Sequence, residues 1–177
     1  GDNVFQRAWI RIPWLFIGMV GGIVGAGVLG SHSSQLEQIP AMAFFIPLIA
    51  AMAGNVGVQS SSIIVQSIAS GTRSFDSVGR KLLKELTVAF SIAFLFSTLI
   101  FVYNYFFNGN MRLTYSVSIT LFIVMIFASV FGTVIPLVLN KFKIDPAVAT
   151  GPFITTTNDI LGLLIYMTVA QMFFKIL

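Results

Sequence analysis

Charged residues are scarce in this sequence. Only 9% of the 177 residues are Asp, Glu, Lys or Arg, whereas 56% are hydrophobic and the mean hydropathy is +0.93. A soluble globular domain carries about 25% charged residues, so this chain lacks the polar surface that water requires. The shortage excludes an ordinary soluble domain and predicts a protein embedded in lipid.

Cysteine is absent and histidine occurs once, at His32. Without cysteine there is no disulfide framework, no thiolate nucleophile and no cysteine-based metal site. A membrane-embedded serine hydrolase would need a base beside its serine, whereas His32 falls in a connecting loop, so we expect no enzyme. The formal net charge of +4 forms no basic stripe along a helix face, which argues against a nucleic-acid partner.

Long apolar stretches fill most of the chain. Apart from one acidic residue in the last, the five stretches carry no Asp, Glu, Lys or Arg: 12–36, 38–72, 86–111, 113–140 and 146–174. A helix crosses the hydrocarbon core with about 20 apolar residues, so each stretch suffices for one crossing. They lack the period-2 alternation of a barrel, the other structure that satisfies its backbone in lipid. We predict an all-α integral membrane protein, with residues 1–177 forming a single transmembrane domain of five helices.

The placement of Lys and Arg predicts the orientation. Eight of the ten fall on one side of the membrane and two, Arg112 and Lys175, on the other. The eight are Arg7, Arg11, Arg73, Arg80, Lys81, Lys84, Lys141 and Lys143. Because basic residues collect in cytoplasmic loops, we expect a multi-pass protein of the plasma membrane with its N-terminus in the cytoplasm. The amphipathic segment 73–85 is expected to extend the third spanning helix into the cytoplasmic interface.

Asp159 is the acidic residue inside the last apolar stretch. It lies 14 residues after Asp145, or roughly 20 Å along a helix, which is close to mid-bilayer. A carboxylate there costs about 2.5–3.5 kcal/mol on insertion scales, so it should face protein or water. Residues at helical spacing from it form one polar, small-residue stripe: Pro152, Thr155, Thr156, Gly162 and Tyr166. The pattern favours an ion pathway; the alternative is a protonated Asp159 that pins two helices together.

The second apolar stretch holds Pro47 and the run 53–62, which is rich in glycine, amides and serine. Proline and glycine inside a span permit a kink near Gly54, which would free carbonyl oxygens that suit hard cations. Asn55 and Ser62 share one helical face, on which Gln59 and Gln66 also lie. Small and amide residues serve plain helix packing as well, so packing and pore lining both stay open here.

Two further features have ordinary structural explanations. The pair Asp145-Pro146 is typical of a helix start, with Asp145 as N-cap and proline at the first helical position. If that helix lines a pore, Asp145 also places negative charge at the cytoplasmic mouth. The glycine-rich pattern between Gly18 and Gly30 indicates close packing of the first helix.

Two blocks of this sequence resemble the MgtE family of magnesium channels. The first block, which resembles a GGNAGNQ-type segment, is Pro47 followed by Ala53-Gly54-Asn55-Val56-Gly57-Val58-Gln59-Ser60. The second, in the last stretch, is Asp145-Pro146-Ala147, Gly151-Pro152-Phe153, Thr155-Thr156, Asp159, Gly162 and Ile165-Tyr166. The opening Arg11-Ile12-Pro13-Trp14-Leu15 and Pro136 are similar too, so the resemblance covers nearly the whole chain.

The resemblance implies a homodimeric helical bundle with a cation pore on the dimer axis, lined by the second and fifth spanning helices. It implies that Asp159 is the central acidic residue, that Gly54 is the pore glycine and that Ser62 is a hydroxyl near the ion. Family members usually carry cytoplasmic regulatory domains. Since the chain opens on Gly1, we expect it to be a segment of a longer protein. Two positions depart from the pattern: Ala53 replaces a glycine, and Val58 replaces an asparagine that faces the ion.

These observations predict a divalent cation channel, most readily for Mg²⁺ and also for Mn²⁺ or Co²⁺. The ion would pass hydrated, because Mg²⁺ dehydrates reluctantly. The expected ion-contacting set is Asp159, Gly54, Asn55, Ser62, Thr155 and Asp145. The alternative is a proton-coupled carrier with Asp159 as proton relay. A helical assembly module without transport is a third hypothesis.

Overall fold

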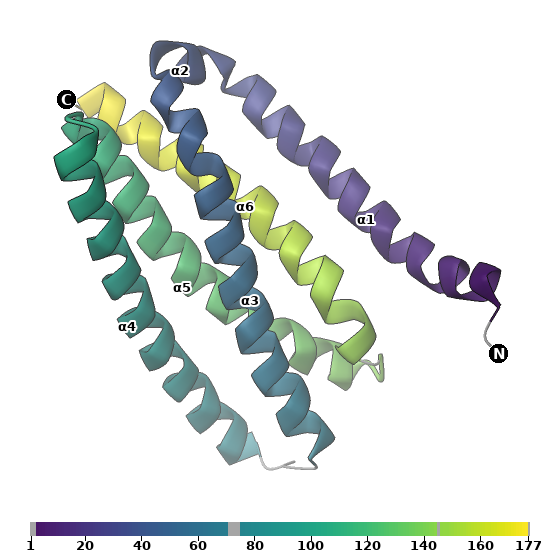
Figure 1. The fold of residues 1–177 in the computed structure, drawn as a ribbon. Coiled ribbons are helices and arrows are strands. Elements are labelled where there is room, and N and C mark those ends of the chain that lie inside the picture. Colours follow the sequence, from purple (N-terminus) through teal and green to yellow (C-terminus); the bar gives the residue numbers. More distant parts are fainter. Residues whose placement is uncertain (1–2, 71–74, 145, 177) are drawn as a thin grey trace.

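The computed structural model describes residues 3–70, 75–144 and 146–176, and its regular elements there are all helical (Figure 1). In chain order the elements are α1 (Val4–Ser31), α2 (Ser33–Gln38), the 3₁₀ helix η1 (Pro40–Phe45), α3 (Ile46–Ala69), α4 (Phe75–Phe107), α5 (Met111–Lys141) and α6 (Pro146–Ile176). Within the described ranges, five helices are long and apolar enough to cross a membrane. The prediction of an all-α membrane protein with five spans is therefore confirmed.

The α4 helix extends beyond the third apolar stretch at its N-terminal end, into the segment that was predicted to be amphipathic. It begins at Phe75, seven residues before its membrane-spanning part, Leu82–Phe107. The expected helical extension of the third span is thus confirmed from Phe75 onward. Residues 73 and 74 of the predicted segment lie outside the described residues.

The α5 helix is the centre of the bundle. It packs against α3, α4 and α6, whereas α1 packs against α6 at the edge (Figure 1). Its inward face combines apolar side chains such as Val117 and Met125 with small hydroxyl residues such as Ser116 and Thr120, all fully buried. Small residues let membrane helices approach closely, because lipid provides no hydrophobic force between them.

Two glycines mark the closest crossing of α3 and α5. A Cβ atom on Gly132 would clash with the carbonyl oxygen of Gly57 and lie 3.1 Å from its Cα atom. Gly57 is also crowded from α6, because a Cβ there would clash with the Asn158 amide and lie 2.8 Å from Ile154 Cγ2. The absence of side chains at Gly57 and Gly132 therefore sets how closely three helices meet.

The second span has its irregularity in a different place from the one predicted. Pro47 lies in the first turn of α3, where its missing N–H needs no partner, and the helix continues through Gly54 to Ala69. The break comes earlier, where η1 joins α3, and Tyr166 Oη donates a hydrogen bond to the Met42 carbonyl at 3.1 Å there. A local break that would free carbonyls near Gly54 is therefore absent from α3.

Candidate ion-pathway site

Asp159 lies near the middle of the α6 helix and inside its apolar span, Gly151–Phe174, and its side chain is half-buried. One turn earlier, Thr155 is also half-buried, and its hydroxyl donates to the Gly151 carbonyl at 3.0 Å. That bond uses the only hydroxyl proton, so the oxygen keeps an acceptor site for a water of hydration. The pair offers a charge and a hydroxyl oxygen at successive turns of one helix.

Gly54 of α3 faces this turn of α6. An ideal Cβ on the buried Gly54 would lie 3.7 Å from Thr155 Cγ2, which is ordinary contact distance. The structure therefore brings together Gly54 and Thr155, two of the residues that the sequence singled out on different spans. An exposed strip of α3 runs beside Gly54 and contains Asn55, Val58, Gln59 and Ser62.

Asn55 and Ser62 lie on that exposed strip of α3. Ser62 Oγ donates to the Val58 carbonyl at 2.8 Å, so its oxygen too can accept but has no spare proton. Val58 itself is 39% exposed, although an apolar residue there has no polar contact to offer. Asp145, the last member of the predicted set, lies outside the described residues.

The residues of the stripe that was predicted around Asp159 contact different parts of the bundle. Gly162 faces the bundle interior, with Val124 and Ile49 within 3.7 Å of an ideal Cβ, and Tyr166 is fully buried. Thr156 packs on α1 at Gly21, where a Cβ would clash with its methyl group. Thr155 meets α3 at Gly54 and Gly162 meets α3 at Ile49, whereas Thr156 meets α1, so these residues do not all face one neighbour.

Asn158 is the important polar residue that sequence reasoning missed. Its side chain is 1% exposed, and its Nδ2 donates to the Ala53 carbonyl on α3 at 3.3 Å. The interhelical link considered for Asp159 is thus made by its neighbour. The signal was a four-residue repeat of inward positions on α6: Ile154, Asn158, Gly162 and Tyr166.

Ala53, one of the two departures from the family pattern, has a structural explanation. Its side chain is fully buried, and its Cβ lies 3.9 Å from the ideal Cβ position of Gly162 on α6. That distance is an ordinary van der Waals contact, so the methyl group of Ala53 fits against α6 without a clash. The α3–α6 contact therefore tolerates alanine at this position.

Metal binding by protein ligands alone would need several donors at one point. Among the described residues, no group of three or more His, Cys, Asp or Glu side chains could hold a metal ion. Mg²⁺ keeps several waters and is commonly held by one or two carboxylates. The chemistry available at Asp159 and Thr155 therefore suits a hydrated ion that is contacted through its water shell.

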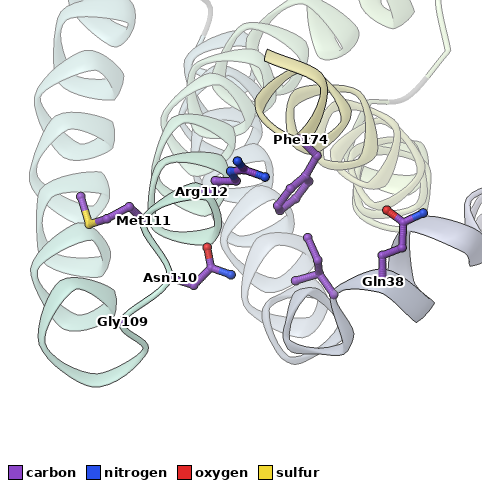
Figure 2. Close-up of a pocket in the computed structure, with 7 residues that line it drawn as sticks. Gln38, Gly109, Asn110, Met111, Arg112 and Phe174 are labelled. Carbon is purple, nitrogen blue, oxygen red and sulfur yellow. The ribbon is translucent and has the colours of Figure 1, made fainter. Parts of the chain in front are cut away.

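A surface cavity of about 700 Å³ lies away from these residues, at the end of the bundle where α4 joins α5 (Figure 2). Figure 2 shows Asn110 and Arg112 on one side of it, with Gln38 and Phe174 opposite. None of the residues predicted to contact the ion lines this cavity.

Comparison with known proteins identifies the family. The model of the MgtE family, described as a divalent cation transporter, matches residues 46–169, which include Gly54, Thr155 and Asp159. This chain belongs to the MgtE family. The MgtE proteins are transporters rather than enzymes, which agrees with the expectation from the sequence.

Three relatives extend the match along the chain, each described as "Magnesium transporter MgtE". The protein of Bacillus subtilis is 35% identical over 171 residues, and that of Thermus thermophilus is 31% identical over 177. The Enterococcus faecalis protein is 30% identical over 174 residues. The alignments cover 97–98% of this chain but only 38–39% of each relative, so the chain spans less than two-fifths of their length.

Proposed function

We propose that this MgtE-family domain forms a channel for hydrated divalent metal cations, with Mg²⁺ as the principal ion. The observation that carries the proposal is Asp159, a half-buried carboxylate inside the α6 span, one helical turn after Thr155, which faces Gly54. An acidic residue at that depth is costly unless it serves an ion or a proton. The description of three relatives as magnesium transporters supports Mg²⁺, and Mn²⁺ and Co²⁺ are further candidate ions.

The exposed face of α3 supports a pore between two copies of the chain. Four polar residues inside the second span are exposed on it: Asn55, Gln59, Ser62 and Gln66. Amide side chains are unfavourable against lipid tails, so this face requires water or another protein surface. A second copy related by two-fold symmetry would bring the two α3 faces and the two Asp159 carboxylates around one axis.

Paired carboxylates would then control the ion. Two Asp159 side chains that face each other repel, and a divalent cation between them relieves that repulsion. The hydroxyl oxygens of Thr155 and Ser62 accept hydrogen bonds from the ion's water shell, which Mg²⁺ gives up reluctantly. Asp145 adds negative charge where the ion would enter from the cytoplasm. Carboxylates supply the attraction, and oxygen acceptors recognise the hydrated ion.

The second candidate function is a proton-coupled carrier, in which Asp159 releases a proton as the cation moves. We expect Mg²⁺ flux into liposomes containing the full-length protein to persist when the proton gradient is collapsed with an ionophore. Flux of Mn²⁺, Co²⁺ and Ca²⁺ in the same assay measures selectivity. Flux that stops with the proton gradient would establish the carrier instead.

Orientation and location follow from the basic residues. The eight Lys and Arg residues predicted on one side support an N-terminus in the cytoplasm and a C-terminus outside a plasma membrane. The exposed Ser33 at the start of α2 would then face outward. Because the chain lacks cysteine, a single cysteine at Ser33 reports the orientation through labelling with a membrane-impermeant reagent. Labelling of this cysteine from the cytoplasmic side only would show that the orientation is the opposite of the proposed one.

Val58 provides a test of selectivity. It lies on the exposed strip of α3 between Asn55 and Ser62, where an amide could contact the water shell of the ion. We expect Val58→Asn to raise the ratio of Mg²⁺ to Ca²⁺ flux several-fold, because an amide adds hydrogen bonds of defined geometry. Ile63, also exposed on α3, supplies the control variant Ile63→Asn. An equal ratio in Val58→Asn and the parent would mean that this position does not face the ion.

A further inference from the structure

Glu85 is a second acidic residue on the inward side of a spanning helix. It lies three residues inside the α4 span and is half-buried. One and two turns later, Ala89 and Ala93 on the same face are 4% and 0% exposed. From the sequence, Glu85 belonged to an amphipathic interfacial segment; in the structure it points into the bundle. Intramembrane acids that face protein are functional candidates by default.

A chain of hydrogen bonds connects Glu85 to two other helices. Ser60 Oγ of α3 donates to Glu85 Oε1 at 2.7 Å and lies 3.0 Å from Ser129 Oγ of α5. Both serines are buried, at 2% and 1% exposure. Since Ser60 has one hydroxyl proton and gives it to Glu85, Ser129 must donate to Ser60. We call Glu85, Ser60 and Ser129 the three-helix clasp.

The clasp joins two helices that otherwise contact each other mainly through α5. Both α3 and α4 pack closely on α5, and they are not themselves among the closely packed pairs (Figure 1). Between them lies an apolar groove of about 190 Å³, with Met52 on the α3 side and Phe96 on the α4 side. Leu121 of α5 also lines it. The Ser60–Glu85 bond is a direct side-chain hydrogen bond between α3 and α4.

The clasp contacts α3 on the side opposite its exposed polar face. Ser60 and Ser62 are two residues apart, or roughly 200° around a helix, so one points to the clasp while the other is exposed. A tie at Ser60 therefore limits rotation of α3 about its own axis. That rotation sets the direction in which Asn55, Val58 and Ser62 face.

We propose that Glu85 is a positioning residue for ion transport, which acts through Ser60 to hold the polar face of α3 toward the ion pathway. The inference rests on the proposed function, because it assumes that this face lines the pathway. The carboxylate is needed as a hydrogen-bond acceptor and not as a charge that the ion meets. Loss of the tie would let α3 rotate, which changes both the rate and the selectivity of flux.

Substitutions separate the acceptor role from a charge role. We expect Ser60→Ala and Glu85→Ala in the full-length protein each to lower Mg²⁺ flux roughly fivefold, the effect of one buried hydrogen bond. Both should shift the ratio of Mg²⁺ to Ca²⁺ flux, and the double variant should be no worse than either single one, because they remove the same tie. Glu85→Gln keeps an acceptor oxygen and should transport like the parent. The matched control is Thr87→Ala, an exposed residue of the same helix.

The outcomes are decisive even where a variant folds poorly. If Glu85→Ala is not recovered as a folded protein, Ser60→Ala and Glu85→Gln still carry the test. Low Mg²⁺ flux in Glu85→Gln together with normal flux in Ser60→Ala would show that transport needs the charge of Glu85. An unchanged ratio of Mg²⁺ to Ca²⁺ flux in Ser60→Ala would show that the tie does not orient α3. Either result overturns the proposal. The same assay on Asp159→Asn tests the ion pathway separately, because its result does not depend on the clasp.

Discussion

Replacement of Asp159 by asparagine is expected to abolish most divalent cation flux while the protein stays folded. Asparagine keeps the shape of the side chain but removes one negative charge per chain, and two from a dimeric pore. We expect at least a tenfold loss of Mg²⁺ flux, which corresponds to about 1.4 kcal/mol of lost stabilisation at the ion. Asp159→Ala should lose flux similarly, because the missing contribution is electrostatic.

Measurement of thermal stability beside flux distinguishes this result from a structural defect. If Asp159 only pinned helices together, asparagine would be tolerated and alanine would destabilise the bundle, by about 0.6 kcal/mol for one interhelical hydrogen bond. The structure favours the electrostatic role, since the neighbouring Asn158 makes the link to α3. Thr168→Ala, at an exposed position nine residues further along α6, serves as the control. Normal flux in a well-folded Asp159→Asn protein would rule out the ion-pathway role.

A methyl group at Gly132 is expected to disrupt the bundle. The new Cβ would meet the Gly57 carbonyl and backbone of α3, which cannot move aside as a flexible side chain could. Overpacking of a tight core costs about 1–3 kcal/mol and occasionally more, and a clash with backbone belongs at the upper end. We expect Gly132→Ala to lower the midpoint of thermal unfolding in detergent by roughly 5 °C or more, with loss of monodisperse protein.

The matched control for this prediction is Gly79→Ala. Gly79 is exposed on α4, and nothing lies within 4 Å of an added Cβ. Alanine has the higher helix propensity by up to about 1 kcal/mol, so the intrinsic effect of both substitutions is stabilising. A drop in unfolding temperature confined to Gly132→Ala therefore reports the α3–α5 crossing. Equal unfolding temperatures for the two variants would contradict the tight crossing.

Five spanning helices were predictable because the property that decides them is local. A segment without charge and long enough to cross the hydrocarbon core must satisfy its own backbone hydrogen bonds, and only a helix does so within one segment. The extension of α4 to Phe75 followed from amphipathic spacing in the same way. Asp159 was equally predictable as a functional candidate, since the cost of a mid-membrane carboxylate depends on its depth.

The inward faces of those helices could not be predicted in the same way. Lipid is as apolar as the bundle interior, so hydrophobic periodicity does not distinguish the two sides of a spanning helix. Asp159 and its helical neighbours were therefore predicted to form one stripe. In the structure, Gly162 and Tyr166 face the interior and Thr156 contacts α1. Pro47 was interpreted as a residue that permits a kink, because its place within the first turn of α3 depends on where η1 ends.

The sequence by itself determined the membrane class, the number of spans and the presence of a carboxylate inside the last span, because length, charge and backbone hydrogen bonding act within each segment. Only the tertiary structure decided that Asn158 links α6 to α3, that Gly57 and Gly132 meet, and that Glu85 turns toward Ser60. Each of these contacts joins residues from different helices. Small-residue fit and buried hydrogen bonds decide such contacts, and neither leaves a periodic signal in one segment of a chain that is apolar on all sides.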